Sequence, residues 1–182
     1  MQHKYNLELK RIKIRPLNIG DIELLRKLRN EDYNRMWFIN SNKISKYEQR
    51  KWFECYKHKK NDFMFIVEDK LNNTFIGSVA LYDIDKDIGE FGRLIIDNSK
   101  VKNGFGYDAT MGACIIGFEK LNLDKIRLEV YKSNLRAIRI YEKVGFIEIN
   151  ESKSSLIKCM QLEKKEFNLM REEINKNGNT II

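Results

Sequence analysis

Proline, histidine and cysteine are scarce in this sequence, with one, two and three residues among 182. Cys55, Cys114 and Cys159 are odd in number, widely separated and outside any Cys-x-x-Cys or Cys/His cluster. This spacing argues against a zinc site, so no metal is expected. It also favours a reducing compartment, and we predict a cytoplasmic location.

Long apolar runs are absent as well. The longest, residues 113–118, contains a glycine and is far shorter than the ~20 residues that span a bilayer. The first six residues have neither the apolar core nor the small-residue cleavage site of a secretory signal. We therefore expect no membrane partner.

Positive charge is in surplus, with a formal net charge of +8 at pH 7. Such a surplus can attract nucleic acid. However, the lysines are interleaved with Asp and Glu along most segments, and no stacked aromatic and basic surface is evident. We interpret the charge as a solvated surface that also attracts anionic ligands, and expect no nucleic-acid partner.

The hydrophobic periodicity predicts an α+β fold with a mixed sheet, in the order β-α-α-β-β-β-α-β-α-β-β. A Ser45-x-x-Glu48 capping box begins the second helix, and Gly145 is placed to end the last one. We expect one domain over residues 1–166 and a polar tail, frayed or disordered, over residues 167–182. The expected strands are 9–15, 63–68, 74–82, 88–96, 126–131, 146–150 and 156–164, and the expected helices lie near 22–28, 45–59, 104–121 and 135–143.

The turn Gly104-Phe105-Gly106 lies between an expected strand and an expected helix. The first N–H groups of a helix have no partner inside it, and the peptide dipoles add positive charge there. Glycines let this backbone approach a phosphate closely. The turn is neither a Walker loop nor a full dinucleotide fingerprint, so alone it is weak evidence for a ligand.

A second motif follows at Asn134, Ala137 and Tyr141, which are spaced by three and four residues and so project from one side of a helix. Ala137 is small enough to let a ligand lie close. A lone Tyr141 would be an ordinary core aromatic. Together with the upstream glycine turn, the motif favours a ligand-facing surface.

Both motifs resemble those of the GNAT superfamily of N-acetyltransferases. That superfamily carries a Gln/Arg-x-x-Gly-x-Gly/Ala turn before one helix and an Asn-x-x-Ala-x-x-x-Tyr helix that ends in Gly-Phe. Residues 91–146 match this pattern except at Val101, a substitution common in the branch that resembles ribosomal-protein N-acetyltransferases. The resemblance implies a mixed, mostly antiparallel sheet flanked by helices, splayed central strands, and acetyl-CoA as the acetyl donor.

The resemblance also implies the binding residues for the donor. Residues 102–107 would hold the pyrophosphate, the end of the strand at 94–96 would pair with the pantetheine amides, and Asn134 would bond the pantetheine arm. Lys100 and Arg136 are candidates for the other phosphates. The implied cofactor-binding residues are Leu94, Ile95, Ile96, Lys102, Asn103, Gly104, Phe105, Gly106, Tyr107, Asn134, Arg136 and Ala137.

Acetyl transfer needs a base, because an amine of pKa near ~10 is mostly ammonium at neutral pH. By the resemblance, Glu129 is our choice of base and Tyr141 the proton donor to the leaving sulfur. Glu90 is the rival base, and Glu129 could equally serve only to bind Arg127. A backbone N–H near residues 94–95 could stabilise the developing oxyanion.

The acceptor side is expected in the first two helices and their loop. Asn30, Trp37 and Asn40 resemble the corresponding segment of nucleotide-amino-sugar N-acetyltransferases, and are our candidates for substrate binding, although Trp37 could equally fill the core. The leading acceptor is an amine on a nucleotide-linked sugar, and the runner-up is the N-terminus of a (ribosomal) protein. A noncatalytic acyl-CoA-binding module is the third possibility. The sequence leaves the acceptor, the acyl length and a possible homodimer open.

Overall fold

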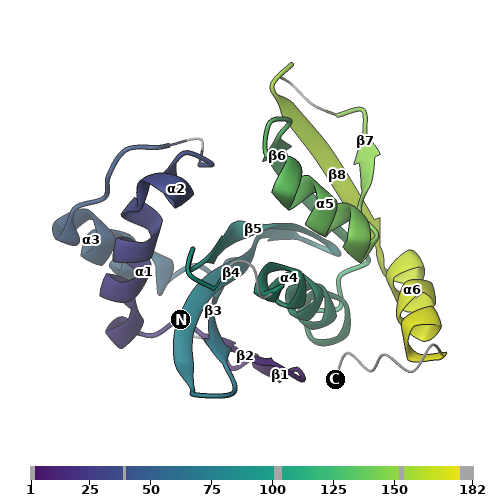
Figure 1. Cartoon of the computed structure of the whole chain (residues 1–182), viewed down its shortest axis with the longest axis horizontal. Helices are drawn as coiled ribbons and strands as arrows, with labels where there is room; N and C mark the ends of the chain where they lie inside the picture. The colour runs from purple at the N-terminus through teal and green to yellow at the C-terminus, as the bar shows by residue number, and fades with distance from the viewer. Residues whose placement is uncertain (1–2, 39, 101–103, 152–153, 177–182) are drawn as a thin grey trace.

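The computed structural model describes residues 3–38, 40–100, 104–151 and 154–176. One eight-stranded sheet has the order β1-β2-β3-β4-β5-β6-β8-β7, and among these pairings only β5 and β6 run parallel. The predicted class, an α+β fold with a mixed and mostly antiparallel sheet flanked by helices, is confirmed (Figure 1). In chain order the elements are β1 (Leu7–Glu8), β2 (Ile12–Pro16), a 3-10 turn (Ile19–Asp21), α1 (Ile22–Asn30), α2 (Asp32–Arg35), α3 (Lys46–Tyr56), β3 (Phe63–Asp69), β4 (Thr74–Asp85), β5 (Ile88–Ile96), α4 (Phe105–Ile115) with a π-helical extension (Ile116–Lys120), β6 (Lys125–Tyr131), α5 (Leu135–Val144), β7 (Ile147–Ile149), β8 (Ile157–Glu163) and α6 (Lys164–Lys176).

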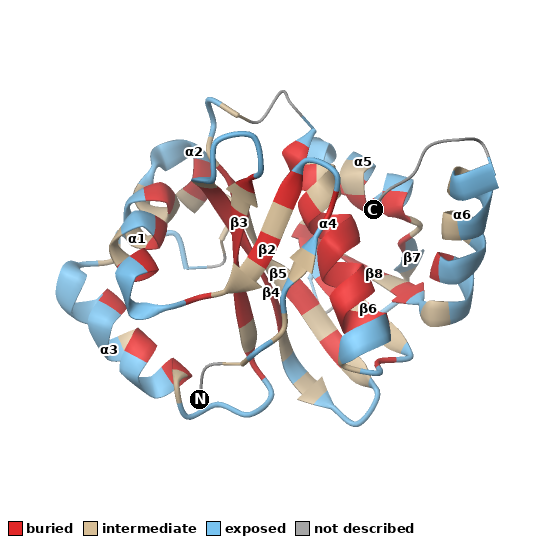
Figure 2. Cartoon of the chain, turned by 90° about the horizontal axis from the view of Figure 1, so that it is seen from below, coloured by how far each residue is buried: buried red, intermediate tan, exposed pale blue. Residues whose placement is uncertain are grey.

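Helices cover both faces of the sheet. Alternate residues of a strand point to opposite sides, so one strand can contribute to the core on each face. Met64 and Ile66 pack in a cluster with α1 and α3. Phe65 and Val67, their neighbours in β3, belong to the larger core beneath α4 and α5. Figure 2 shows α1 and α3 on one side of the sheet and α4 on the other, with buried residues between the layers.

Local signals in the sequence set several boundaries as predicted. The Ser45 hydroxyl accepts from the Glu48 N–H at 3.2 Å, and the Glu48 carboxylate accepts from the Ser45 N–H at 2.7 Å, so the capping box begins α3. Gly145 ends α5 with φ of 103°, which a residue with a Cβ rarely adopts. The expected strand at 9–15 is instead a hairpin, because the chain reverses at residues 9–11 between β1 and β2.

The central strands diverge after a short parallel ladder. Their register pairs Ile88 with Lys125 and ends where Glu90 faces Arg127. Beyond that point β5 remains bonded to β4, and β6 to β8. The edge of residues 94–96 that faces β6 therefore has no strand partner among the described residues, and the predicted splay is confirmed.

The C-terminal segment is folded as far as the structure describes it. The division expected between residues 166 and 167 falls inside α6. Phe167 is fully buried, and its ring lies 5.1 Å from that of Phe118 in the extension of α4. Residues 164–176 thus contribute to the same core as the rest of the sheet.

Candidate active site

A cleft of about 620 Å³ occupies the wedge between β5 and β6. The ends of these strands and α5 form one part of its wall, and α1, α2 and the segment after them form the other. The sequence-predicted residues that line it are Trp37, Asn40, Glu90, Leu94, Ile95, Ile96, Gly106, Glu129, Asn134, Arg136, Ala137 and Tyr141.

The glycine turn begins α4 as expected. Gly104 is the N-cap with φ of 78°, in the left-handed region that suits glycine. Of the described residues predicted in this turn, Gly106 lines the cleft, whereas Gly104, Phe105 and Tyr107 do not. Lys102 and Asn103 lie outside the described residues.

Arg11 is a basic residue near this turn that sequence reasoning missed. Its guanidinium forms an ion pair with Asp108 at 2.7 Å and lies 5.3 Å from the centre of the Phe105 ring. Arg11 is in the β1–β2 turn, more than ninety residues before Gly104, so the sequence offers no local signal for this contact.

The Asn134 motif forms one wall of the cleft. The side-chain oxygen of Asn134 accepts from the Ala137 N–H at 3.2 Å and so caps α5. Arg136 donates to the hydroxyl of Tyr33 at 2.7 Å, which connects α5 with α2. Both Arg136 and Tyr33 line the cleft, so this contact joins its two sides.

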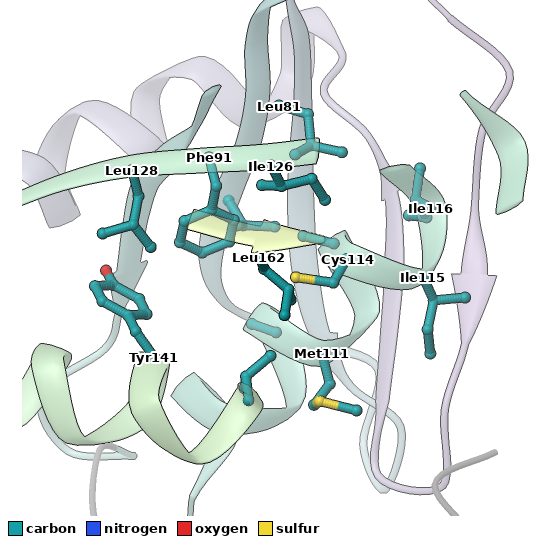
Figure 3. Close-up of a cluster of buried hydrophobic side chains, with 14 of the residues drawn as sticks. Leu81, Phe91, Met111, Cys114, Ile115, Ile116, Ile126, Leu128, Tyr141 and Leu162 are labelled. Atoms are coloured by element: carbon teal, nitrogen blue, oxygen red, sulfur yellow. The ribbon is translucent and has the colours of Figure 1, made fainter. Parts of the chain in front are cut away.

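Tyr141 projects from α5 toward the wedge. Its ring packs edge-on against Phe91, with the ring centres 5.6 Å apart, and Figure 3 shows the hydroxyl directed away from the helix toward Leu128. Burial, and to a lesser degree the nearby Tyr82, raises the pKa of Tyr141. The phenol therefore keeps its proton at neutral pH, as a proton donor requires.

Glu90 and Glu129 both line the cleft. Glu90 lies in the ladder between Tyr82 of β4 and Arg127 of β6. Its pKa is raised chiefly by burial and next by the charge of Glu129, while Arg127 acts in the opposite direction. Glu129 lies two residues beyond Arg127 and is exposed.

Arg93 and Tyr82 form a second polar feature of the cleft, which sequence reasoning also missed. Arg93 makes a bidentate ion pair with buried Asp62 at 2.6 and 3.0 Å, and its guanidinium lies 4.3 Å from the centre of the Tyr82 ring. A Cβ on Gly92 would lie 2.8 Å from the Tyr82 hydroxyl, so glycine leaves room for that ring. Asp62 precedes Arg93 by thirty-one residues, a separation at which only the fold reveals the pair.

On the acceptor side, Trp37 and Asn40 line the cleft, but Asn30 does not. The Asn30 side chain donates to the Ile44 carbonyl at 2.8 Å and accepts from the Ile44 N–H at 2.8 Å. Instead of reaching a ligand, Asn30 holds the loop between α2 and α3 against α1.

Within residues 3–38, 40–100, 104–151 and 154–176, no three His, Cys, Asp or Glu side chains are grouped so that they could hold a metal ion. No helix in these ranges combines the length and the apolar character that a membrane crossing requires.

The sheet opened between two strands, the glycine-capped helix and the buried phenol in the wedge match the pattern that the resemblance predicted for an acyl-CoA-dependent acetyltransferase. The family model described as "Acetyltransferase (GNAT) domain" matches residues 11–147. The chain therefore belongs to the GNAT acetyltransferase family and is an N-acetyltransferase, with acetyl-CoA as its co-substrate.

Its relatives include enzymes with a named acceptor. The chain is 30% identical over 137 residues to a spermidine N(1)-acetyltransferase of Vibrio cholerae, covering 74% of this chain and 78% of that protein. It is 31% identical over 138 residues to the spermidine N(1)-acetyltransferase of Escherichia coli K12, covering 74% and 72%.

Solved structures resemble this one over most of their length. The spermidine N-acetyltransferase of Vibrio cholerae in complex with CoA and spermine has a TM-score of 0.80 at 25% identity, covering 86% of this chain and 98% of that one. A nucleotide-linked sugar GNAT, apo FdhC, has a TM-score of 0.83 at 21% identity, covering 99% and 100%. The second likeness concerns the fold alone.

Proposed function

We propose that this protein transfers the acetyl group of acetyl-CoA to a primary amine on a nucleotide-linked amino sugar. The observation that supports acetyl transfer to an amine is that a protonated phenol, Tyr141, and two carboxylates, Glu90 and Glu129, line one cleft, and the sugar acceptor rests on the resemblance of the segment around Trp37 and Asn40. An acid and a base on either side of a thioester are what acetyl transfer to an ammonium group needs.

The residues present fit the pantetheine arm of the donor. Residues 94–96 have a backbone edge with no strand partner in the part of the chain that the structure describes, and a ligand with amide groups can bond to it as a neighbouring strand would. Gly106 lies in the first turn of α4, where N–H groups and the helix dipole favour phosphate. Acetyl-CoA supplies the activated acyl group and a thiol leaving group.

In the proposed mechanism, Glu90 takes a proton from the acceptor ammonium, directly or through water. The raised pKa of Glu90 makes it a stronger base than an ordinary glutamate, and the charge of Glu129 contributes to that shift. Glu129, the base expected from the resemblance, is the alternative. With the donor bound, the deprotonated amine would attack the thioester carbonyl, a backbone N–H near residues 94–95 would stabilise the oxyanion, and Tyr141 would give its proton to the sulfur as the C–S bond breaks.

A polyamine is the second candidate acceptor. It is favoured by the relatives named as spermidine N(1)-acetyltransferases, at 30% and 31% identity. It is also favoured by the side chains of Asp83, Glu90 and Glu129, which line the cleft and attract cations. A protein N-terminus, as in the ribosomal-protein branch, remains an alternative acceptor.

A measurement of CoA release tests the proposal. The purified protein would be given acetyl-CoA with a nucleotide-linked amino sugar, with spermidine, or with an N-terminal peptide, and kcat/KM would be compared. We expect the amino sugar nucleotide to give the highest value. Faster turnover of spermidine or the peptide would contradict the proposed acceptor, and no turnover of any amine would contradict the mechanism.

A further inference from the structure

A second cavity, of about 380 Å³, opens beside the cleft. It lies between α1, α3 and the loop that joins α2 to α3. None of its described lining comes from α4 or α5, the helices at the donor side. The residues that line both cavities are Arg29, Phe38, Asn40, Arg93 and Ile95, so the two spaces adjoin on the acceptor side.

Gln49 is the first observation that points to a ligand here. It lines the cavity although only 5% of the residue is exposed. Its side-chain amide has no hydrogen bond to any residue that the structure describes. The amide atoms are not enclosed by protein, so they are accessible from the cavity, where they offer both a donor and an acceptor. The amide is therefore suited to a ligand with an adjacent N–H and C=O, such as a pyrimidine base.

An aromatic surface lies next to this amide. Trp52, one turn further along α3, also lines the cavity. Its ring is stacked on that of Tyr56 with centres 5.3 Å apart and planes inclined by 12°, which fixes its orientation. A planar ligand can pack against an indole held in this way.

The charge of the cavity is positive. Arg29 lies with its guanidinium 4.4 Å from the centre of the Phe38 ring and donates to the main-chain carbonyls of Asn40 and Asn42. Among the described residues no carboxylate bonds to it. Lys43 adds a second cation. The carboxylate of Glu48, which also lines the cavity, accepts a hydrogen bond from the Ser45 N–H. Such a surface attracts an anion and repels a polyamine.

We propose that the second cavity binds the nucleoside diphosphate part of the acceptor, with Gln49 at the edge of a pyrimidine base, Trp52 against its face and Arg29 and Lys43 near the phosphates. This inference rests on the proposed function, since the sugar amine would then reach Glu90 and Tyr141 in the adjoining cleft. The acceptor would then have two ends: an anionic diphosphate beside Arg29 and Lys43, and a cationic amine beside Glu90.

Uridine diphosphate is the probe that tests this assignment. Its binding would be measured by calorimetry in the wild type, in Gln49→Met and in Lys43→Glu, with Lys51→Ala as the control because Lys51 is an exposed residue of α3 that does not line the cavity. We expect each cavity variant to weaken binding about tenfold or more, and the control to bind like the wild type. Acetyl-CoA affinity, measured in every variant, should not change and reports correct folding.

The outcomes separate this inference from the proposed function. Binding that depends on Gln49 and Lys43 supports the cavity assignment even if no sugar is acetylated. Turnover of an amino sugar nucleotide with the same KM in Lys43→Glu as in the wild type would overturn the cavity assignment and leave the acetyltransferase proposal standing. Displacement of uridine diphosphate by CoA would place the probe in the donor site, and would also overturn it.

Discussion

Among single residues, Tyr141 and Glu90 share a raised pKa, which suits the acid and the base of the proposed mechanism. A raised pKa keeps the Tyr141 phenol protonated, and a raised pKa makes the Glu90 carboxylate a better proton acceptor. Desolvation is the largest cause in both cases, since an apolar surrounding disfavours any charged form. Burial in the wedge between the strands thus suits both roles in the proposed mechanism.

Replacing Tyr141 with Phe tests the acid. We expect kcat to fall by about 10²–10⁴-fold, because proton donation to the thiolate is lost. Stability should change little, since the hydroxyl bonds to no described residue and the ring contacts with Phe91 remain. Steady-state kinetics and thermal unfolding would be measured beside Tyr47→Phe, the same chemical change at an exposed site. Equal kcat in both variants would remove Tyr141 from the mechanism.

The pH–rate profile tests the base. A base acts when deprotonated, so kcat/KM should rise as pH increases through the pKa of Glu90. In Glu129→Gln the carboxylate charge that raises this pKa is gone, so the rise should move to lower pH. In Glu90→Gln the rate should drop by about 10²-fold or more and the rise should disappear. If the rise survives in Glu90→Gln and vanishes in Glu129→Gln, then Glu129 is the base.

Among the secondary-structure elements, the β4–β5 hairpin determines the shape of the site. Its register shifts between Ser78 and Ala80, and the Ser78 hydroxyl donates to the Arg93 carbonyl at 3.1 Å. Arg93 has φ of 50°, unusual for a residue with a side chain. The ion pair with Asp62 holds this strained residue, and through it the position of Tyr82.

Breaking that ion pair tests its role in the hairpin. Asp62→Asn leaves the Arg93 charge unpaired, so we expect the free energy of unfolding to fall by about 3–5 kcal/mol. The double variant Asp62→Asn with Arg93→Met should cost less than Asp62→Asn and Arg93→Met added together. Denaturant titration of all four proteins would measure this coupling. Strictly additive losses would show that the pair does not hold the strand.

Local signals account for the elements that the sequence predicted well. The side chains of Ser45 and Glu48 each accept a hydrogen bond from the other residue's backbone N–H, and Gly145 caps α5 in the left-handed conformation. Both signals involve residues that are close in sequence. The cleft residues near Asn134 were predictable because a motif with helical spacing carries them. The Arg93–Asp62 pair was not predictable, since its partners meet only once β3, β4 and β5 are assembled. The same holds for Gln49, which local patterning does not distinguish from any other residue of α3.

For the whole molecule, the contact between α6 and the core lies at the opposite end of α4 from the cleft. The donor and acceptor sides meet at the wedge, whereas α6 packs at the far end of α4 (Figure 1). Phe167 is buried against Phe118 and is continuous with the main core. Loss of this contact should therefore reduce stability without altering the chemistry of the site.

Phe167→Ala tests that separation, with Leu169→Ala as the control because Leu169 is in the same helix but 48% exposed. Removing the buried ring should lower the free energy of unfolding by about 3–5 kcal/mol, and the control should change it by less than about 1 kcal/mol. At a temperature where each variant is folded, kcat and the KM for acetyl-CoA should equal those of the wild type. Equal stability of the two variants would mean that α6 adds nothing to the core, and a lower kcat in folded Phe167→Ala would mean that α6 is coupled to the cleft.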